Sequence, residues 1–227
     1  INDSTVDERT IQNNDANTYD LFVPRQQVNH YRASLQNLFI LGKSRLGINL
    51  SYQQNHRKEF GNVFAPDDYE LYFFLQTLSY DIKYYLPEMQ GWETTVGIGG
   101  MQQQNQNKGE EFIIPAYKLF DFGAFAVTKK NFGKLTLSGG VRYDIRTLNS
   151  DALYLDADEK PVPQPDATTE TRFAPFTRTF NNVTGSVGGT YTLNNKWLLK
   201  LNVARGFRAP NMSELASNGK HEGTLRY

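Results

Sequence analysis

Hydrophobic and polar residues alternate over long stretches of this chain, the pattern of β-strands that have one greasy face and one polar face. The clearest stretch is residues 134–146, KLTLSGGVRYDIR, where the odd positions are mostly apolar and the even positions mostly polar or charged. This stretch is roughly twice as long as the usual strand of a globular domain. A tilted strand of that length can cross a lipid bilayer.

The same alternation recurs along the chain and predicts eight strands. They are residues 27–41, 45–57, 71–86, 92–102, 118–129, 134–146, 179–193 and 197–205. The stretch 118–129 is the least regular, because phenylalanines fall on both of its faces. We therefore predict an all-β fold, an antiparallel up-and-down meander of about eight long strands that forms a segment of a transmembrane β-barrel.

The connections between these strands alternate between short turns and long loops. The long loops are residues 58–70, 103–117 and 147–178. Because antiparallel strands deliver successive connections to opposite ends of a sheet, all the short turns are expected at one end. Outer-membrane barrels have this asymmetry. Aromatic residues near the short turns predict a girdle at the bilayer interface: Tyr84, Tyr85, Trp92, Tyr191 and Trp197.

Alternation alone leaves open which face is buried in protein. A soluble lipocalin-like ligand-binding β-barrel, greasy inside and polar outside, has the same period. Strand length, loop asymmetry and the aromatic residues at strand ends favour the membrane. A Lys or Arg that faces lipid at mid-depth would cost about 2–4 kcal/mol, and the predicted apolar faces contain neither. The soluble barrel is the alternative, and a small closed outer-membrane barrel of eight strands is a third hypothesis.

Composition narrows the function classes. The formal net charge is zero, so no basic surplus points to a nucleic-acid partner. A mean hydropathy of −0.57 and the lack of a long apolar run exclude a membrane-spanning helix. Without cysteine the chain has no disulfide and no thiolate metal site. Nothing supports acid–base or covalent catalysis, so we expect no enzyme activity and no cofactor.

The predicted organisation has two parts. Residues 1–24 are polar, rich in Asn and Asp, and are expected to form an outer loop; residues 25–227 form a partial β-barrel domain. The chain does not begin with Met, so we expect a mature product or an excised piece. Residues 223–227 look like the start of a ninth strand, which indicates a segment of a larger barrel.

The last loop carries the most specific motif. Residues 204–211 read ARGFRAPN, and they are followed by Glu214-Leu215, Asn218-Gly219, His221 and Gly223-Thr224. This series resembles the signature of TonB-dependent outer-membrane receptors. Two shorter pieces, residues 55–60 and residues 140–144, also resemble recurring parts of those barrels. The resemblance extends from about residue 24 to the end of the chain.

That resemblance implies a transport function in the bacterial outer membrane. Such receptors import scarce nutrients (ferric siderophores, haem, cobalamin, metal ions or glycans) through a 22-stranded barrel closed by an N-terminal plug. The implied partners are outer-membrane lipid, a small-molecule nutrient and, through the plug, the TonB complex. By the same resemblance the plug, the TonB-contacting box and the closing strands are missing. An isolated chain with two unpaired edges is expected to self-associate or to close on itself.

Six charged or titratable residues are candidates for substrate binding in the lumen or the outer loop. They are Arg142, Asp144, Arg146, Arg208, Glu214 and His221. The first three share the polar face, where they form either a charged wall that guides an anionic ligand or a salt-bridged interior. Arg208 and Glu214, with Arg205, are expected to brace the last loop to the barrel wall.

Metal binding has little support. The acidic residues of the 147–178 loop either collect a calcium ion or form a solvated acidic loop: Asp151, Asp156, Asp158, Glu159 and Asp166. The three histidines are scattered, and His221-Glu222 lacks the second histidine of a zinc-protease motif, so no metal site is predicted. Residues 102–106 either hydrogen-bond a polar ligand or are simply hydrated. The identity of the nutrient cannot be read from these residues.

Overall fold

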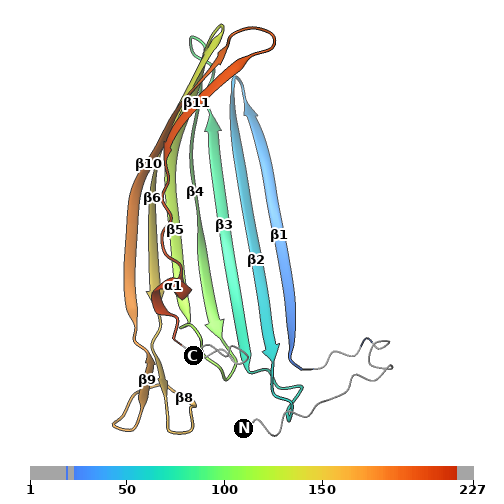
Figure 1. Cartoon of the computed structure of the whole chain (residues 1–227), viewed down its shortest axis with the longest axis vertical. Coiled ribbons are helices and arrows are strands. Elements are labelled where there is room, and N and C mark those ends of the chain that lie inside the picture. Colours follow the sequence, from blue (N-terminus) through green and yellow to red (C-terminus); the bar gives the residue numbers. More distant parts are fainter. Residues whose placement is uncertain (1–18, 20–22, 219–227) are drawn as a thin grey trace.

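Eight long strands form one antiparallel sheet in the computed structural model, which describes residue 19 and residues 23–218 (Figure 1). The order across the sheet is β1-β2-β3-β4-β5-β6-β10-β11, so each long strand pairs with the next along the chain. The strands are β1 (Arg25–Leu41), β2 (Ser44–Phe60), β3 (Leu71–Tyr85), β4 (Trp92–Asn107), β5 (Tyr117–Phe132), β6 (Leu135–Ser150), β10 (Phe176–Thr192) and β11 (Leu198–Arg205). The predicted all-β meander is confirmed.

Several strands continue further toward the long loops than the alternation predicts. β4 ends at Asn107, five residues beyond the predicted end at 102, and β10 begins at Phe176 instead of 179. The added residues are mostly polar on both faces, so an alternation of apolar and polar positions does not reveal them. Their backbones nevertheless pair with the neighbouring strand, and the β3–β4 ladder continues as far as Phe73 opposite Asn107. Strands of 15–17 residues exceed the roughly 9–11 that a bilayer needs.

The loop at 147–178 is folded, which the sequence interpretation missed. Three short strands, β7 (Leu153–Leu155), β8 (Pro161–Val162) and β9 (Glu170–Phe173), form a second sheet in the order β8-β7-β9. Leu155 and Phe173 are buried there against Phe112 of another long loop. Strands of two to four residues are too short to show a period, and acidic residues surround them.

Strand register separates the two faces of the large sheet. Val141 lies opposite Ala126 and Gly185, whereas its neighbour Arg142 lies opposite Phe125 and Thr184. Val141 is 53% exposed and Leu201 of β11 is 73% exposed, so the greasy face points outward. The lipocalin-like alternative requires such residues in a dry centre, and their exposure contradicts it.

The aromatic residues predicted near the short turns are exposed there with one exception, and their place at a bilayer interface stays a prediction. Tyr84, Trp92, Tyr191 and Trp197 are all exposed on the outside. Tyr85 was wrongly included, because its ring faces the interior, where the Arg45 guanidinium stacks on it 4.8 Å from the centroid.

The large sheet has two edges. β1 and β11 each pair on one side, and in residues 23–218 no pairing joins them to each other, so this part of the chain is an open sheet and not a closed eight-stranded barrel. Self-association of the isolated chain stays a prediction, as does the division into residues 1–24 and 25–227. The predicted ninth strand at 223–227 and most of the 1–24 loop lie outside the described residues.

One helix, α1 (Met212–Ala216), follows β11 and was not predicted. Figure 1 shows the chain leaving β11 and descending beside the sheet to α1, close to the ends of β6 and β10. In the described ranges, no helix has the length and apolar character needed to cross a membrane.

Candidate functional site

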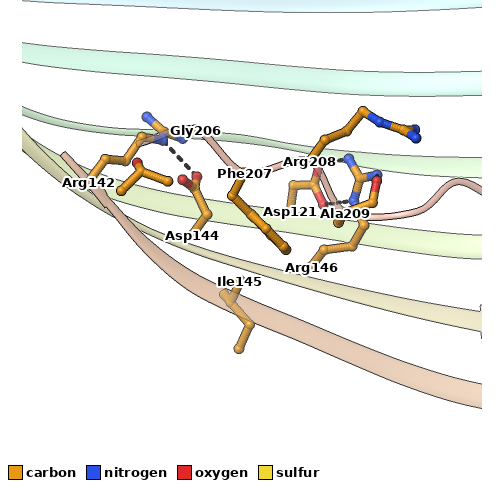
Figure 2. A pocket seen from close by; sticks show the side chains of 10 residues that line it. Asp121, Arg142, Asp144, Ile145, Arg146, Gly206, Phe207, Arg208 and Ala209 are labelled. Atoms are coloured by element: carbon orange, nitrogen blue, oxygen red, sulfur yellow. Dashed lines mark hydrogen bonds and ion pairs between the residues drawn. The ribbon is translucent and has the colours of Figure 1, made fainter. Parts of the chain in front are cut away.

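The candidate site lies where the chain returns over the inner wall after β11. Residues 206–218, here called the return segment, include the larger part of the ARGFRAPN motif at 204–211, whose first two residues belong to β11, and all of α1. With the wall strands they enclose a hollow of about 450 Å³ lined by Asp121, Arg142, Asp144, Arg146, Thr184, Phe207 and Arg208, among others. Figure 2 shows Asp121, Arg142, Asp144, Arg146 and Phe207 on one side of the sheet, with the Arg208 side chain extending away from them and the Ile145 side chain on the other side of the sheet.

Arg146 joins the wall to the return segment. Its Nε and Nη2 atoms donate to Oδ1 and Oδ2 of Asp121 at 2.7 and 2.6 Å, a bidentate pair across β5 and β6. Its Nη1 donates to the carbonyl oxygens of Ala209 and Pro210, each at 3.5 Å. One guanidinium therefore connects two strands and the return segment.

Arg142 and Asp144 form a second pair on the same face of β6. Arg142 Nε donates to Asp144 Oδ1 at 2.7 Å, and its guanidinium lies 5.7 Å from the centroid of the Phe125 ring. Gly123 lies directly opposite Asp144. A Cβ atom at Gly123 would collide with Arg142 Nη2 and Asp144 Oδ1. Glycine at this position therefore provides the space for the ion pair.

A third pair stabilises the return segment from within. Arg208 donates two hydrogen bonds to the carboxylate of Glu214, at 2.9 and 2.7 Å. Glu214 also accepts from the backbone N–H of Asn211, whose side chain accepts from the Glu214 N–H, a capping box that begins α1. The hydrogen bonds from Arg208 and from Asn211 lower the pKa of Glu214 from 4.5 to about 2.

The bracing role predicted for Arg208 and Glu214 therefore needs correction. Their contacts lie within the return segment, and Arg146 makes the connection to the wall. The sequence interpretation placed Arg146 on the inner face but gave it no contact with the last loop. A strand pattern states which face a residue is on, and it carries no information on what a distant loop brings to that face.

An apolar seat holds α1 against the wall, and sequence reasoning missed it. Met212 is 3% exposed and packs against Leu119 and Leu148. Beyond α1, the backbone N–H of Asn218 donates to the carbonyl of Ile113. Leu148 occupies the same face of β6 as Arg146. A leucine on an otherwise polar face was the available signal that something apolar covers this end of the wall.

Four of the six predicted site residues thus line one hollow: Arg142, Asp144, Arg146 and Arg208. A fifth, Glu214, is bonded to Arg208. Each of the three arginines has a carboxylate partner, so the charges of this cluster balance. The described residues form the salt-bridged interior, and guidance of an anionic ligand stays a prediction. His221 lies outside the described residues.

Metal binding gains no support from the part of the chain that the structure describes, which contains no group of three or more His, Asp or Glu residues able to hold an ion. Asp166 instead closes its own turn by accepting from Thr168 and Thr169, and these hydrogen bonds lower its pKa to about 2. The glutamine-rich stretch at 102–106 divides between the faces, with Gln103 donating to Thr77 on the inside.

These features define a segment of an outer-membrane type of barrel, and residues 2–226 match the family model described as TonB dependent receptor-like, beta-barrel. The chain therefore belongs to this family, whose members are receptors and transporters of the bacterial outer membrane and not enzymes. No curated protein matches the sequence.

Among solved structures, the chain is similar to a double mutant of the Serratia marcescens hemophore receptor HasR in complex with its hemophore HasA and heme. The TM-score is 0.60 at 15% sequence identity, covering 87% of this chain and 33% of that one. Identity this low shows a shared fold alone. The chain spans about a third of the length of that receptor.

Proposed function

We propose that this chain is part of a receptor that imports a scarce nutrient across the bacterial outer membrane. The observation that carries the proposal is the inverted polarity of the sheet. Val141, Val187 and Leu201 are exposed on the outer face, while ion pairs such as Arg146–Asp121 lie on the inner face. A wall that is greasy outside and polar inside suits a water-filled passage surrounded by lipid.

The proposed cargo is a ferric siderophore, haem, another metal ion complex or cobalamin. The name of the similar solved receptor includes heme, which makes haem the first nutrient to test. The proposed partners are outer-membrane lipid and the TonB complex, the latter acting through a plug domain of the whole receptor.

Within the lumen we assign different roles to the arginines. Arg146 is bonded to both the wall and the return segment, so it holds the passage in shape. The side chains of Arg142 and Arg208 are 38% and 72% exposed and line the hollow, so they can turn toward an anionic ligand. Asp144 and Glu214 hold these two arginines when no ligand is present, and His221 is proposed to approach the same passage.

The test is growth of a strain that lacks the gene on single sources of iron, haem or cobalamin. We expect growth to fail on one source and to be restored by the full-length gene. The double variant Arg142→Gln/Arg208→Gln should need more of that nutrient for half-maximal growth. Arg32→Gln is the matched control, because Arg32 is an inward arginine that donates to Ser51 away from the hollow. Normal growth of the deletion strain on every source would refute the proposal.

A further inference from the structure

Aromatic rings and two lysines gather on the outer face of β2, β3 and β4, at the end that leads to the long loops. We call this group the Lys58–Lys108 cluster. Its members are Tyr31, His56, Lys58, Tyr69, Tyr72, Phe74 and Lys108. None of them belongs to the lumenal site.

The ammonium groups of Lys58 and Lys108 both make cation–π contacts with the rings of the cluster. Lys58 Nζ lies 4.7 Å from the centroid of Tyr69 and 4.9 Å from that of Tyr72. Lys108 Nζ lies 4.5 Å from the centroid of Phe74 and 5.8 Å from that of Tyr72. Cation–π contacts of this kind hold a flexible lysine in place and leave its N–H donors available to an acceptor.

The register places the two lysines on either side of one tyrosine. Lys58 is the partner of Tyr72 in the β2–β3 ladder, and the backbone N–H of Lys108 donates to the Tyr72 carbonyl. Two strand spacings therefore separate their backbones, roughly 10 Å. One tetrahedral anion with its substituents can reach both ammonium groups across that distance.

The rings are themselves fixed. His56 Nδ1 and the Tyr72 hydroxyl are 2.8 Å apart, and the His56 ring lies 4.6 Å from the centroid of Phe74. Tyr31 of β1 contacts the same histidine edge-on. The lysines therefore contact a preorganised group of rings from three strands, β1, β2 and β3, and from Tyr69 of the loop that precedes β3.

Among the strand residues, no carboxylate shares the outer face with these lysines. Other acidic residues close to them in the sequence lie in the adjoining loops, and one of these, Asp67, pairs with Arg25. In the seven strands β1–β6 and β10, the register places every Asp and Glu on the inner face: Glu59, Asp81, Glu93, Asp121 and Asp144. Within the described residues, none of the ion pairs includes Lys58 or Lys108. In the part of the chain that the structure describes, neither ammonium group is therefore neutralised by an ion pair, and both are open to an external partner.

The depth of the cluster suits a lipid headgroup. Toward the middle of the sheet the next outward residues on β2 and β3 are Gln54 and Gln76, which both donate to the Tyr52 hydroxyl. Beyond this polar row the outward face is apolar and includes Leu50 and Leu78, both exposed. Amphipathic rings at such a boundary mark the membrane–water interface. At the opposite end Lys130 lies over Trp92 and Phe132 at 5.3 and 5.1 Å, with no second lysine on the same rings among the described contacts.

We propose that the Lys58–Lys108 cluster binds the phosphate group of an anionic lipid in the leaflet at the long-loop end. Lys58 and Lys108 donate to the phosphate oxygens, and the acyl chains lie along the outward side chains of Leu50 and Leu78. This inference rests on the proposed placement in a membrane.

The experiment uses the full-length receptor in nanodiscs of phosphatidylcholine with and without phosphatidic acid, and measures retained phosphatidic acid by native mass spectrometry. We expect Lys58→Gln/Lys108→Gln to weaken retention about 30-fold and each single variant about 5-fold. Lys58→Arg/Lys108→Arg should keep it. Lys130→Gln is the matched control, since that lysine also lies over outward aromatic rings, and it should keep retention close to that of the parent, unlike either single variant.

Three results would overturn the inference. The first is retention by the double glutamine variant equal to that of the parent. The second is an equal loss in Lys130→Gln, which would show a general charge effect without a site. The third is displacement of the lipid by an equal concentration of inorganic phosphate, which would assign the site to free phosphate. A receptor that stays folded and monomeric without detergent or lipid would instead contradict the proposed function itself.

Discussion

Arg146 and Asp121 face each other across β6 and β5 and are joined by two parallel hydrogen bonds of 2.7 and 2.6 Å. The remaining guanidinium nitrogen of Arg146 reaches the carbonyls of Ala209 and Pro210. Because a guanidinium is planar and carries five donors, one side chain can serve both partners at once. The ion pair thereby fixes the position of the return segment as well as the packing of two strands.

Breaking that ion pair should release the return segment. Asp121→Asn leaves Arg146 with a weaker partner, and we expect the free energy of unfolding to fall by roughly 1.5–3 kcal/mol. Trypsin should then cleave faster near Arg205 and Arg208. Asp81→Asn is the matched control, because Asp81 pairs with Lys83 on the same face away from the return segment. Equal protease resistance of the two variants would contradict the bracing role of Arg146.

Gly123 and Gly99 are direct partners in the β4–β5 ladder on the inner face, and they should respond differently to alanine. At Gly123 a methyl group displaces Arg142 and Asp144, so Gly123→Ala should lower the free energy of unfolding by about 1–3 kcal/mol. At Gly99 the nearest atoms are the Tyr80 carbonyl oxygen at 3.3 Å and Asp81 Oδ2 at 3.4 Å, so a methyl group needs only a small shift and Gly99→Ala should cost less than Gly123→Ala. Denaturant titration of both variants in detergent provides the comparison. Equal effects would show that space for the Arg142–Asp144 pair does not matter.

The apolar seat of α1 should depend on Met212. Met212→Ala removes a side chain buried between Leu119 and Leu148, and we expect docking of α1 to weaken by about 2–5 kcal/mol. Hydrogen exchange of the α1 amides should rise, while exchange in β3 stays unchanged. Met89→Ala, at a methionine that is 67% exposed in a short turn, should leave both unchanged. Unchanged hydrogen-exchange protection of α1 in Met212→Ala would show that Met212 does not hold this helix against the wall.

Acid should loosen the return segment through Glu214. Its pKa in the folded chain is about 2, below the ordinary 4.5, so its stabilising contribution is fully present above pH 4.5 and is lost as the pH falls toward 2. A fluorophore on Ser217→Cys should report constant docking above that window and progressive release within it. Glu214→Gln should remove this part of the pH dependence. Asp166→Asn, which changes a carboxylate of similarly low pKa in another loop, should not.

The large sheet could be predicted from the sequence because one physical constraint repeats along it. In a strand with one greasy face and one polar face, apolar and polar residues must alternate along the sequence. Stretches such as 134–146 therefore reveal both the strand and its two faces. The alternation is lost where both faces are polar, as at Asn105 and its neighbour Gln106, and the end of β4 was placed too early there. The sheet of β7, β8 and β9 has too few residues per strand to show any period.

The site could be predicted only in part. Arg142, Asp144 and Arg146 were found because an inward charge on a membrane strand is conspicuous. The contacts that determine their structural role join residues far apart in the sequence: Asp121 lies 25 positions before Arg146, and Pro210, whose carbonyl accepts from Arg146, lies 64 positions after it. The burial of Leu148 and Met212 likewise depends on where the return segment lies. Spacing along the chain does not carry that information.

The central claim is that the outward face contacts hydrocarbon and the inward face contacts water. Unfolding of the full-length receptor from lipid bilayers, with a lysine placed on each face, tests it most directly. Val141→Lys introduces a charge at the middle of the outward face of β6, whereas Gln36→Lys introduces the same charge on the inward face of β1, opposite Asn49. We predict a loss of about 2–4 kcal/mol for Val141→Lys and less than about 1 kcal/mol for Gln36→Lys. Equal tolerance of the two lysines, or a greater cost at Gln36, would contradict the account.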